Sequence, residues 1–373
     1  MMKKVVIYVL CVLILCSCWD RRLLKEHSLI LAIGYDLNEN GTISKSVSLP
    51  KESANKAAQE QMPNESETIT TTGHTVSDAD IELERYLSQN FDRSKARVLL
   101  IGEDLAKHGI FPTLDSMYRD PRGPLGASVA IVSKRAEDGL NIEEKQAFLM
   151  SEFYYDLLTT SERSGIIKKE NVQSICPLLL SRSRDVVLPH IELDDEGNTA
   201  NINGLALFTG DKMTGTLTLQ HSIMLLILMD EFKEHIKLNI KIDEDHKDKV
   251  KNFVTFAIRK SKRKFRVYEE SGQIKTDINL KLQVEIEEYP HDELYKKKEV
   301  KQLEKKIKKE ITKLGKETIK QIQEANSDTL GIGDKVKAHY YDTWKQINWH
   351  DIYPEVPITA NFDIDIIQHG IIN

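Results

Sequence analysis

The sequence predicts an α/β protein built as α+β layers, with mixed and antiparallel sheets flanked by helices. Two observations predict this class. Apolar and polar residues alternate strictly at residues 278–287 and again at 358–366, which is typical of strands that bury one face. Between them, residues 293–325 carry apolar side chains at helical spacing. A long amphipathic helix packed on a C-terminal antiparallel sheet explains both patterns, because each element then covers the apolar face of the other.

The long helix also has other interpretations. Its apolar residues do not hold a clean heptad over the whole length, so packing on a sheet is favoured over a coiled coil. Lysines at 296–298, 305–306 and 308–309 are most simply its solvated face. The alternative is a basic surface that meets anionic lipid headgroups.

Shorter patterns predict the other elements. Strands are expected at residues 29–33, 43–47, 97–101, 127–133 and 238–242, and a buried helix at 223–229. Gly204–Gly215 is expected to form a hairpin that turns at Gly210-Asp211. Further helices are expected to begin with Ser77 as N-cap, near Pro112, and at Asn141. The apolar side of the first of these is predicted from four residues: Ile81, Tyr86, Leu87 and Phe91.

The N-terminus has the pattern of an export signal. Lys3 and Lys4 precede an apolar run at residues 5–15, which is shorter than the roughly 20 residues that span a bilayer. The run ends in Leu15-Cys16-Ser17-Cys18, which resembles a bacterial lipobox. That resemblance implies a signal peptide over residues 1–17, cleavage after Ser17 and a diacylglyceryl lipid on Cys18. An uncleaved N-terminal anchor is the alternative.

The cysteine count and the net charge limit the possible disulfides and the classes of partner. Cleavage and lipidation would leave only Cys176, so the mature chain would hold no intrachain disulfide, and Cys176 is predicted to be a small buried residue. The formal charge of −6 argues against a nucleic-acid partner. It also predicts that membrane attachment comes from acyl chains and protein partners rather than from net charge.

No catalytic, metal or cofactor signature is present in the sequence. Gly-x-Ser-x-Gly, His-Glu-x-x-His, Walker and Cys-x-x-Cys patterns are absent. Residues 243–246 form an acidic cluster with a histidine but lack the glycine of a calcium loop, and a solvated turn is favoured. Gly331-Ile332-Gly333 is interpreted as a helix exit with positive φ. Trp344 and Trp349 are either core aromatics or anchors of an interface.

Several segments, in order, resemble one known family. They are Cys18-Trp19-Asp20, Asn203–Gly215, Ala325–Gly333, Trp344–Trp349 and Tyr353–Val356, with a further segment at Ile101–Ile110. The ordered set spans nearly the whole chain and resembles the Ger(x)C lipoproteins, the C subunits of spore germinant receptors. Asp328-Thr329-Leu330 departs from the family pattern, where a more apolar entry to the glycine turn is expected.

The resemblance implies a non-enzymatic subunit on the outer face of the spore inner membrane. It implies assembly with two integral-membrane partners, an A and a B subunit, and no cofactor beyond the lipid. A polar turn at residues 194–198, after which the sequence pattern changes, predicts a domain boundary. We therefore expect an N-terminal domain over residues 18–197, formed as one unit or as two subdomains, and a C-terminal domain over 198–373. Trp344, Trp349, Gly331 and Gly333 are predicted partner contacts. The alternative function is a lipid-anchored solute-binding protein of a transporter, which would show two βα lobes; an anchored cell-wall hydrolase is a third possibility.

Overall fold

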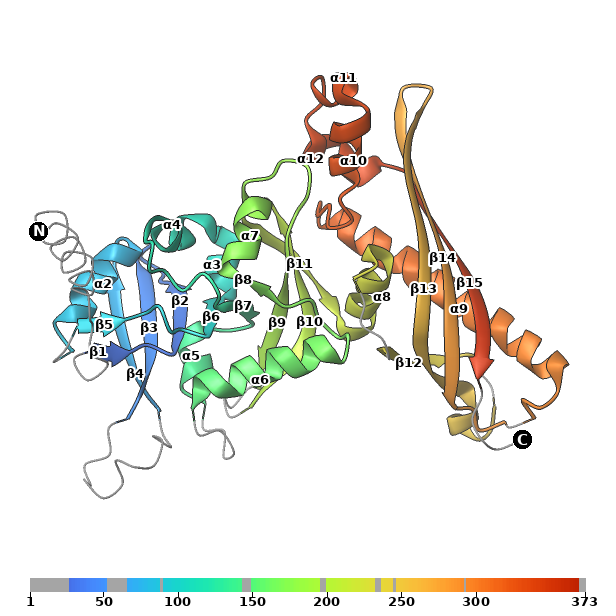
Figure 1. Ribbon diagram of the computed structural model, residues 1–373, viewed down its shortest axis with the longest axis horizontal. Helices are drawn as coiled ribbons and strands as arrows, with labels where there is room; N and C mark the ends of the chain where they lie inside the picture. The colour runs from blue at the N-terminus through green and yellow to red at the C-terminus, as the bar shows by residue number, and fades with distance from the viewer. Residues whose placement is uncertain are drawn as a thin grey trace, which may run out of the picture.

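The computed structural model describes residues 27–51, 66–87, 90–142, 149–194, 199–231, 236–243, 246–291 and 293–368. The predicted signal peptide and Cys18 lie outside these residues. The chain folds as a mixed α/β protein that is elongated in Figure 1, with a large sheet toward the N-terminal end and a smaller sheet toward the C-terminal end. Within the described ranges, no helix is both long enough and apolar enough to span a bilayer.

The large sheet contains nine strands within the described residues, in the order β11-β10-β9-β7-β6-β2-β3-β4, with β8 paired to β7. Its centre is parallel, since β2, β6, β7 and β9 pair in that sense. Strands β1 (His27–Leu29) and β5 (Asn90–Asp92) form a separate parallel pair. The strands of the large sheet are β2 (Ala32–Leu37), β3 (Ile43–Pro50), β4 (Ser66–Gly73), β6 (Val98–Gly102), β7 (Ser128–Val132), β8 (Glu170–Asn171), β9 (Val187–Leu193), β10 (Ala200–Thr209) and β11 (Lys212–Thr218).

Both faces of the central strands are buried, as expected for a parallel sheet covered by helices. In β6, Val98 and Leu100 join one apolar core, whereas Leu99 and Ile101 join the core on the opposite face. Helices α5 (Ala136–Leu140) and α6 (Met150–Arg163) cover the first face. The other face is covered by α2 (Val76–Glu84), α3 (Glu103–His108), α4 (Phe111–Arg119) and α7 (Val172–Leu179).

Two helix starts differ from the sequence prediction. The N-cap of α2 is Thr75, whose hydroxyl accepts from the Asp78 N–H, rather than Ser77. The buried side of α2 is Val76, Ala79 and Leu83, whereas Ile81 is 60% exposed. Tyr86, which is 69% exposed, lies beyond the end of the helix at Glu84. The helix predicted from Asn141 begins at Met150 instead.

Helix α8 (Leu219–Met229) joins the large sheet to the C-terminal region of the molecule. Every residue from Ser222 to Met229 is buried, which is typical of a helix packed on all sides. It packs against β10 of the large sheet and α9 of the C-terminal region, so a single apolar core continues through it. The predicted domain boundary at residues 197/198 falls between β9 and β10, which pair with each other, for example Ile191 with Ile202.

The C-terminal sheet has the order β12-β13-β14-β15. The first three strands are antiparallel, but β15 runs parallel to β14, with Leu280 opposite Phe362. The expectation of a purely antiparallel sheet is wrong there. Parallel neighbours need a long crossover, and the helical segment between β14 and β15 provides it. The strands are β12 (Ile236–Lys241), β13 (Phe253–Glu270), β14 (Gln273–Glu288) and β15 (Ile358–Gln368), with a 3₁₀ turn η3 (Lys249–Asn252) before β13.

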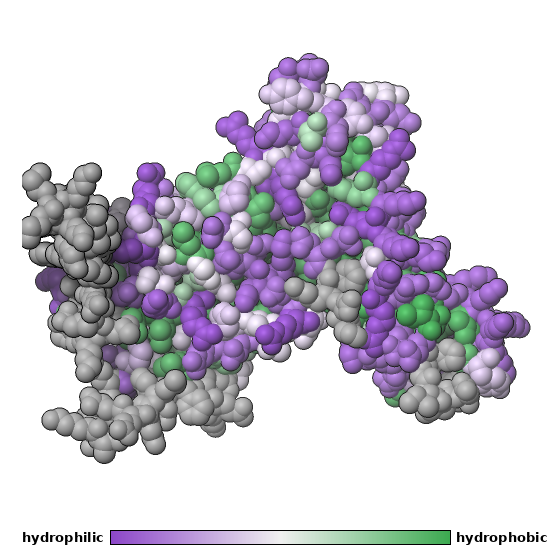
Figure 2. Space-filling model, in the orientation of Figure 1, coloured by the Kyte–Doolittle hydropathy of each residue, from purple (hydrophilic) through white to green (hydrophobic). Residues whose placement is uncertain are grey.

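The long helix is α9 (Lys297–Glu324), and it packs on the C-terminal sheet as predicted. Its buried stripe includes Leu303, Ile307 and Ile311, while the outer face of the sheet is largely hydrophilic in Figure 2. Three short helices and a 3₁₀ turn lead from α9 to β15. They are α10 (Ile332–His339), α11 (Tyr341–Trp344), α12 (Trp349–Ile352) and η4 (Tyr353–Glu355).

Candidate functional site

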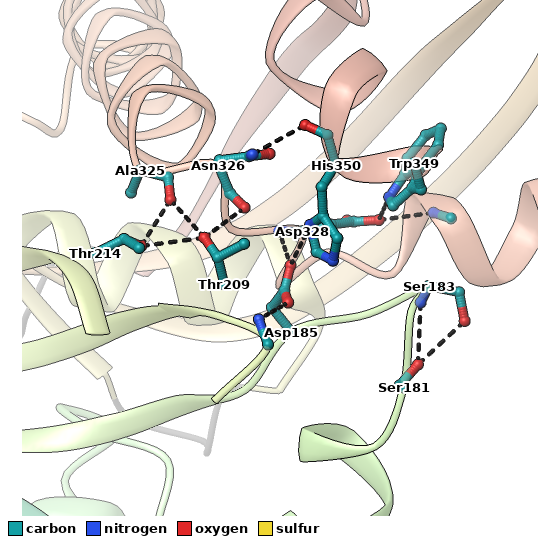
Figure 3. Close-up of polar contacts among 12 residues, drawn as sticks. Ser181, Ser183, Asp185, Thr209, Thr214, Ala325, Asn326, Asp328, Trp349 and His350 are labelled. Carbon is teal, nitrogen blue, oxygen red and sulfur yellow. Dashed lines mark hydrogen bonds and ion pairs between the residues drawn. The ribbon is translucent and has the colours of Figure 1, made fainter. Parts of the chain in front are cut away.

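Three of the family-like segments, Asn203–Gly215, Ala325–Gly333 and Trp344–Trp349, meet at one place, where the β10–β11 turn reaches the loop between α9 and α10 (Figure 3). Gly331, Gly333 and Trp349, three of the four predicted contact residues, lie in this junction. Trp344 packs at its margin, with its ring centroid 6.1 Å from that of Trp349. The junction is therefore the candidate functional site.

Asp328 is the centre of the junction. Its carboxylate accepts three N–H groups: those of Ile332 at 3.0 Å and Gly333 at 2.7 Å, and the indole N–H of Trp349 at 2.9 Å. The first two belong to the first turn of α10, where backbone donors lack partners within the helix. Asp328 thus caps α10 and holds Trp349 in place, although its side chain is completely buried.

Asp185 repeats this role from the other side, in the loop before β9. Its carboxylate accepts the N–H of Gly210 and the N–H of Asp328, both at 2.8 Å. In return, the Asp185 N–H donates to the Asp328 carbonyl at 3.1 Å. The imidazole Nδ1 of His350 lies 4.0 Å from the Asp185 carboxylate. Two carboxylates from distant segments therefore join the large sheet to the C-terminal region through backbone hydrogen bonds.

Threonines of the β10–β11 hairpin complete the connection. The Thr209 hydroxyl donates to the carbonyls of Ala325 and Asn326 at 3.0 Å, and the Thr214 hydroxyl donates to the Ala325 carbonyl at 2.6 Å. The Asn326 amide in turn donates to the His350 carbonyl at 2.9 Å. The two threonine hydroxyls thereby satisfy carbonyls at the C-terminal end of α9, which receive no hydrogen bond from N–H groups within the helix.

The junction requires glycine at two positions, for two different physical reasons. Gly331 has φ +71°, a left-handed conformation that other residues adopt only with strain. A Cβ on Gly333 would lie 2.6 Å from both the Ser183 carbonyl oxygen and the Trp349 indole nitrogen. Positive φ at Gly331 was predicted correctly, but the glycines lead into α10 rather than ending a helix, because α9 has already ended near Ala325.

Burial dominates the electrostatics of the junction. It raises the pKa of Asp328 to about 7, although the three N–H donors act in the opposite direction by favouring the ionised form. Burial also raises the pKa of Asp185, against the effect of its two backbone donors and of His350. Perturbed carboxylates often mark catalytic sites. Here, however, Asp328 is 0% and Asp185 3% exposed, so a substrate cannot reach either carboxylate in this conformation.

The structure therefore separates the four predicted contact residues. Trp349 is 2% exposed, and Gly331 and Gly333 are buried, so none of these three presents a surface to a partner. Trp349 takes the core role that was the alternative interpretation. Trp344 is half-buried, and its role as a partner contact stays a prediction. Sequence reasoning missed Asp185, because a single aspartate in a loop carries no recognisable spacing.

A second buried charge cluster lies in the large sheet. Lys45 of β3 is completely buried and pairs with Asp80 of α2. Arg93 contacts Asp80 and Asp120, each at 3.0 Å. Burial lowers the pKa of Lys45, while Asp80 acts in the opposite direction. The cluster ties α2 to the sheet, which is a structural role.

Among the described residues, no group of three or more His, Cys, Asp or Glu side chains is arranged to hold a metal ion. Residues 244 and 245 of the acidic cluster lie outside the described ranges of the chain. Cys176 is a free thiol beside the Tyr118 hydroxyl, and it is half-buried where the sequence predicted a buried residue.

Comparison with known protein families identifies the chain. Residues 20–193 match the family described as "Spore germination protein N-terminal domain", and residues 203–370 match "Spore germination B3/ GerAC like, C-terminal". The chain belongs to the GerAC-like family of spore germination proteins. The GerAC-like C-terminal match includes the hairpin, the α9–α10 loop and Trp349, and the N-terminal match includes Asp185.

Curated relatives agree with this family. The chain is 22% identical over 371 residues to the spore germination protein GerQC of Bacillus cereus, covering 99% of both chains. It is 20% identical over 383 residues to YfkR of Bacillus subtilis strain 168, also named as a spore germination protein, covering 99% of this chain and 97% of the relative.

A solved structure supports the fold. The crystal structure of the GerBC protein matches with a TM-score of 0.54 and 16% identity, covering 90% of this chain and 96% of the other. The GerAC-like family is a family of germinant receptor subunits and is not a known enzyme family. Family membership supports a C-subunit role in spore germination and an association with a membrane.

Proposed function

We propose that this chain is the lipid-anchored C subunit of a nutrient germinant receptor, and that it acts through assembly with the integral-membrane A and B subunits rather than through catalysis. Its site of action would be the outer face of the spore inner membrane, with Cys18 carrying the lipid. The family match over nearly the whole chain is the observation that carries the proposal.

The geometry of the junction supports a non-catalytic role. Its two carboxylates are already engaged by backbone N–H groups, and Asp328 also by the Trp349 indole. Such groups position elements instead of exchanging protons with a substrate. The junction binds the large sheet to the C-terminal region, which suits a subunit that transmits contacts between partners. The alternative, a solute-binding lipoprotein, calls for a second βα lobe, which the mainly antiparallel C-terminal sheet does not resemble.

The test is a deletion in a spore former, complemented by three versions of the gene. Spores that lack the chain should fail to respond to one class of nutrient, yet still germinate with a stimulus that bypasses receptors. The wild-type chain should restore the response, incorporate a labelled fatty acid and co-purify with polytopic membrane proteins in mild detergent. Cys18→Ala should lose the label, because no other thiol occupies the lipobox position.

Cys176→Ser is the matched control. This cysteine is half-buried and distant in sequence from the lipobox, so the variant should keep both the label and the response. Equal labelling of wild type and Cys18→Ala would show that the wrong cysteine was chosen. An unchanged nutrient response after deletion, in a strain with no second receptor for that nutrient, would favour the solute-binding alternative.

A further inference from the structure

The exposed side of α9 concentrates positive charge on a chain that is acidic as a whole. The helix contains ten lysines and five glutamates, a formal charge of +5, whereas the whole chain carries −6. Five of these lysines line a groove of about 660 Å³ along the outer side of the helix, together with Thr312 and Glu317. They are Lys305, Lys308, Lys309, Lys313 and Lys316, called here the lysine surface.

Few carboxylates neutralise the lysine surface. Lys308 lies 3.7 Å from Asp363 of β15, and Lys309 lies 3.9 Å from Glu310 of its own helix. Within the described structure, Lys305, Lys313 and Lys316 form no ion pair. These lysines cover about 17 Å of helix at a rise of about 1.5 Å per residue. The result is a nearly continuous row of ammonium groups facing solvent.

The chemistry of the row indicates which partner it fits. Protein interfaces are depleted in lysine and enriched in arginine and aromatic residues, which supply rigid contacts. Helix α9 contains neither arginine nor an aromatic residue. Lysine is a hydrated point charge on a flexible stem, suited to phosphates whose positions are not fixed. A cluster of four to eight such charges on an amphipathic helix is typical of binding to anionic lipid.

We propose that the lysine surface docks the C-terminal region of the chain onto a membrane that carries anionic lipid headgroups. The inference rests on the proposed attachment of the chain to a membrane, and it adds a second contact to the lipid on Cys18. Helix α9 would then hold the C-terminal sheet at a defined distance from the bilayer. The net negative charge of the chain does not oppose this, because screening confines the interaction to charges within about 10 Å of the headgroups.

The test measures how close α9 lies to the bilayer in the lipid-anchored full chain. A fluorophore is attached to Gln302→Cys in a Cys176→Ser background, since Gln302 is exposed on the same helix. The protein is reconstituted into nanodiscs of phosphatidylcholine alone, or with about a third phosphatidylglycerol, each containing a quencher on a headgroup. We expect strong quenching only in the anionic discs, and its loss in about 1 M salt, where the Debye length falls to about 3 Å.

Two matched variants locate the contact. Replacing Lys305, Lys309, Lys313 and Lys316 by Gln keeps the helix propensity but removes four charges. Since each lysine near an anionic surface strengthens binding about fivefold, docking should weaken by a factor on the order of several hundred, and quenching should fall to the phosphatidylcholine level. The control replaces Lys260, Lys262 and Lys264 by Gln, since these lysines are exposed on the outer face of β13. Its fluorophore should be quenched as strongly as that of the wild type.

The outcomes separate this inference from the proposed function. Flotation with vesicles of phosphatidylcholine alone, to which the lysine surface should not bind, reports on the lipid anchor alone. A chain that floats but shows no quenching dependent on anionic lipid would overturn the docking inference and leave the anchor standing. Equal loss of quenching in the β13 control would overturn the assignment to α9. A chain that fails to float at all would instead refute the anchor.

Discussion

Replacing Gly333 by alanine is expected to weaken the junction between the large sheet and the C-terminal region. Gly333 lies in the first turn of α10, where its N–H donates to Asp328. The added Cβ would lie 2.6 Å from the Ser183 carbonyl oxygen and 2.6 Å from the Trp349 indole nitrogen. Both are closer than the contacts that a Cβ makes in folded proteins, so one side of the junction must move.

The neighbours of Gly333 have little freedom to move. Trp349 is held by its hydrogen bond to Asp328, and Ser183 by a 2.6 Å hydrogen bond from its hydroxyl to Asp334. Overpacking of a rigid site costs typically about 1–3 kcal/mol. Displacing Trp349 would also lengthen one hydrogen bond to a buried carboxylate, which adds a cost of about 1 kcal/mol. We therefore expect a loss of roughly 2–4 kcal/mol in the free energy of unfolding.

Urea unfolding followed by tryptophan fluorescence measures this loss, because Trp344 and Trp349 lie at or beside the junction. Gly126→Ala is the matched control, since no atom would lie within 4 Å of the added Cβ and the φ of Gly126 is not positive. The control should keep the wild-type midpoint within about 0.5 kcal/mol. If Gly333→Ala unfolded at the same midpoint as Gly126→Ala, the close contact between Gly333, Ser183 and Trp349 would be refuted.

Two further predictions concern buried charges. Because burial raises the pKa of Asp328 to about 7, the folded state binds a proton between about pH 4 and 7 that the unfolded state releases. The stability from this group should be full below about pH 4 and lost as the pH rises through 7, by an amount on the order of 4 kcal/mol. Unfolding midpoints measured against pH should show a shallower decline in Asp328→Asn, and equal slopes would contradict the assignment. Lys45→Ala should cost about 3 kcal/mol, because it leaves Asp80 buried with Arg93 as its remaining partner. Lys237→Ala, which breaks an exposed pair with Glu287, should cost less than about 1 kcal/mol, and equal midpoints for the two lysine variants would show that Lys45 is not buried as described.

Most elements could be predicted because their signals are local. The alternation in β12 and β14 and the apolar stripe of α9 are periodic over many residues, so tertiary context does not change them. The errors occur where the signal is short. The start of α2 lies two positions earlier than predicted because Thr75 competes with Ser77 as N-cap. The helix also ends at Glu84, so three of the four residues predicted for its apolar side, Tyr86, Leu87 and Phe91, lie outside it.

The candidate site was only partly predictable. The sequence identified Gly331, Gly333 and Trp349 as important, but it predicted that they contact a partner, whereas in the structure they pack inside the protein. A tryptophan in a motif looks the same whether its indole meets a partner or a buried carboxylate. Only the hydrogen bond from Trp349 to Asp328 distinguishes the two roles.

The sequence by itself determined the α/β class, the long amphipathic helix and the hairpin turn at Gly210, because these depend on patterns among residues close together in the chain. It also determined the resemblance to one family, because that depends only on the order of short segments along the chain. Tertiary structure decided the parallel pairing of β15 and the contact between Asp185 and Asp328, which are 143 residues apart. Neither can be read from local pattern, because strand direction depends on the path of the crossover, and a buried carboxylate is stable only where folding brings N–H donors to it.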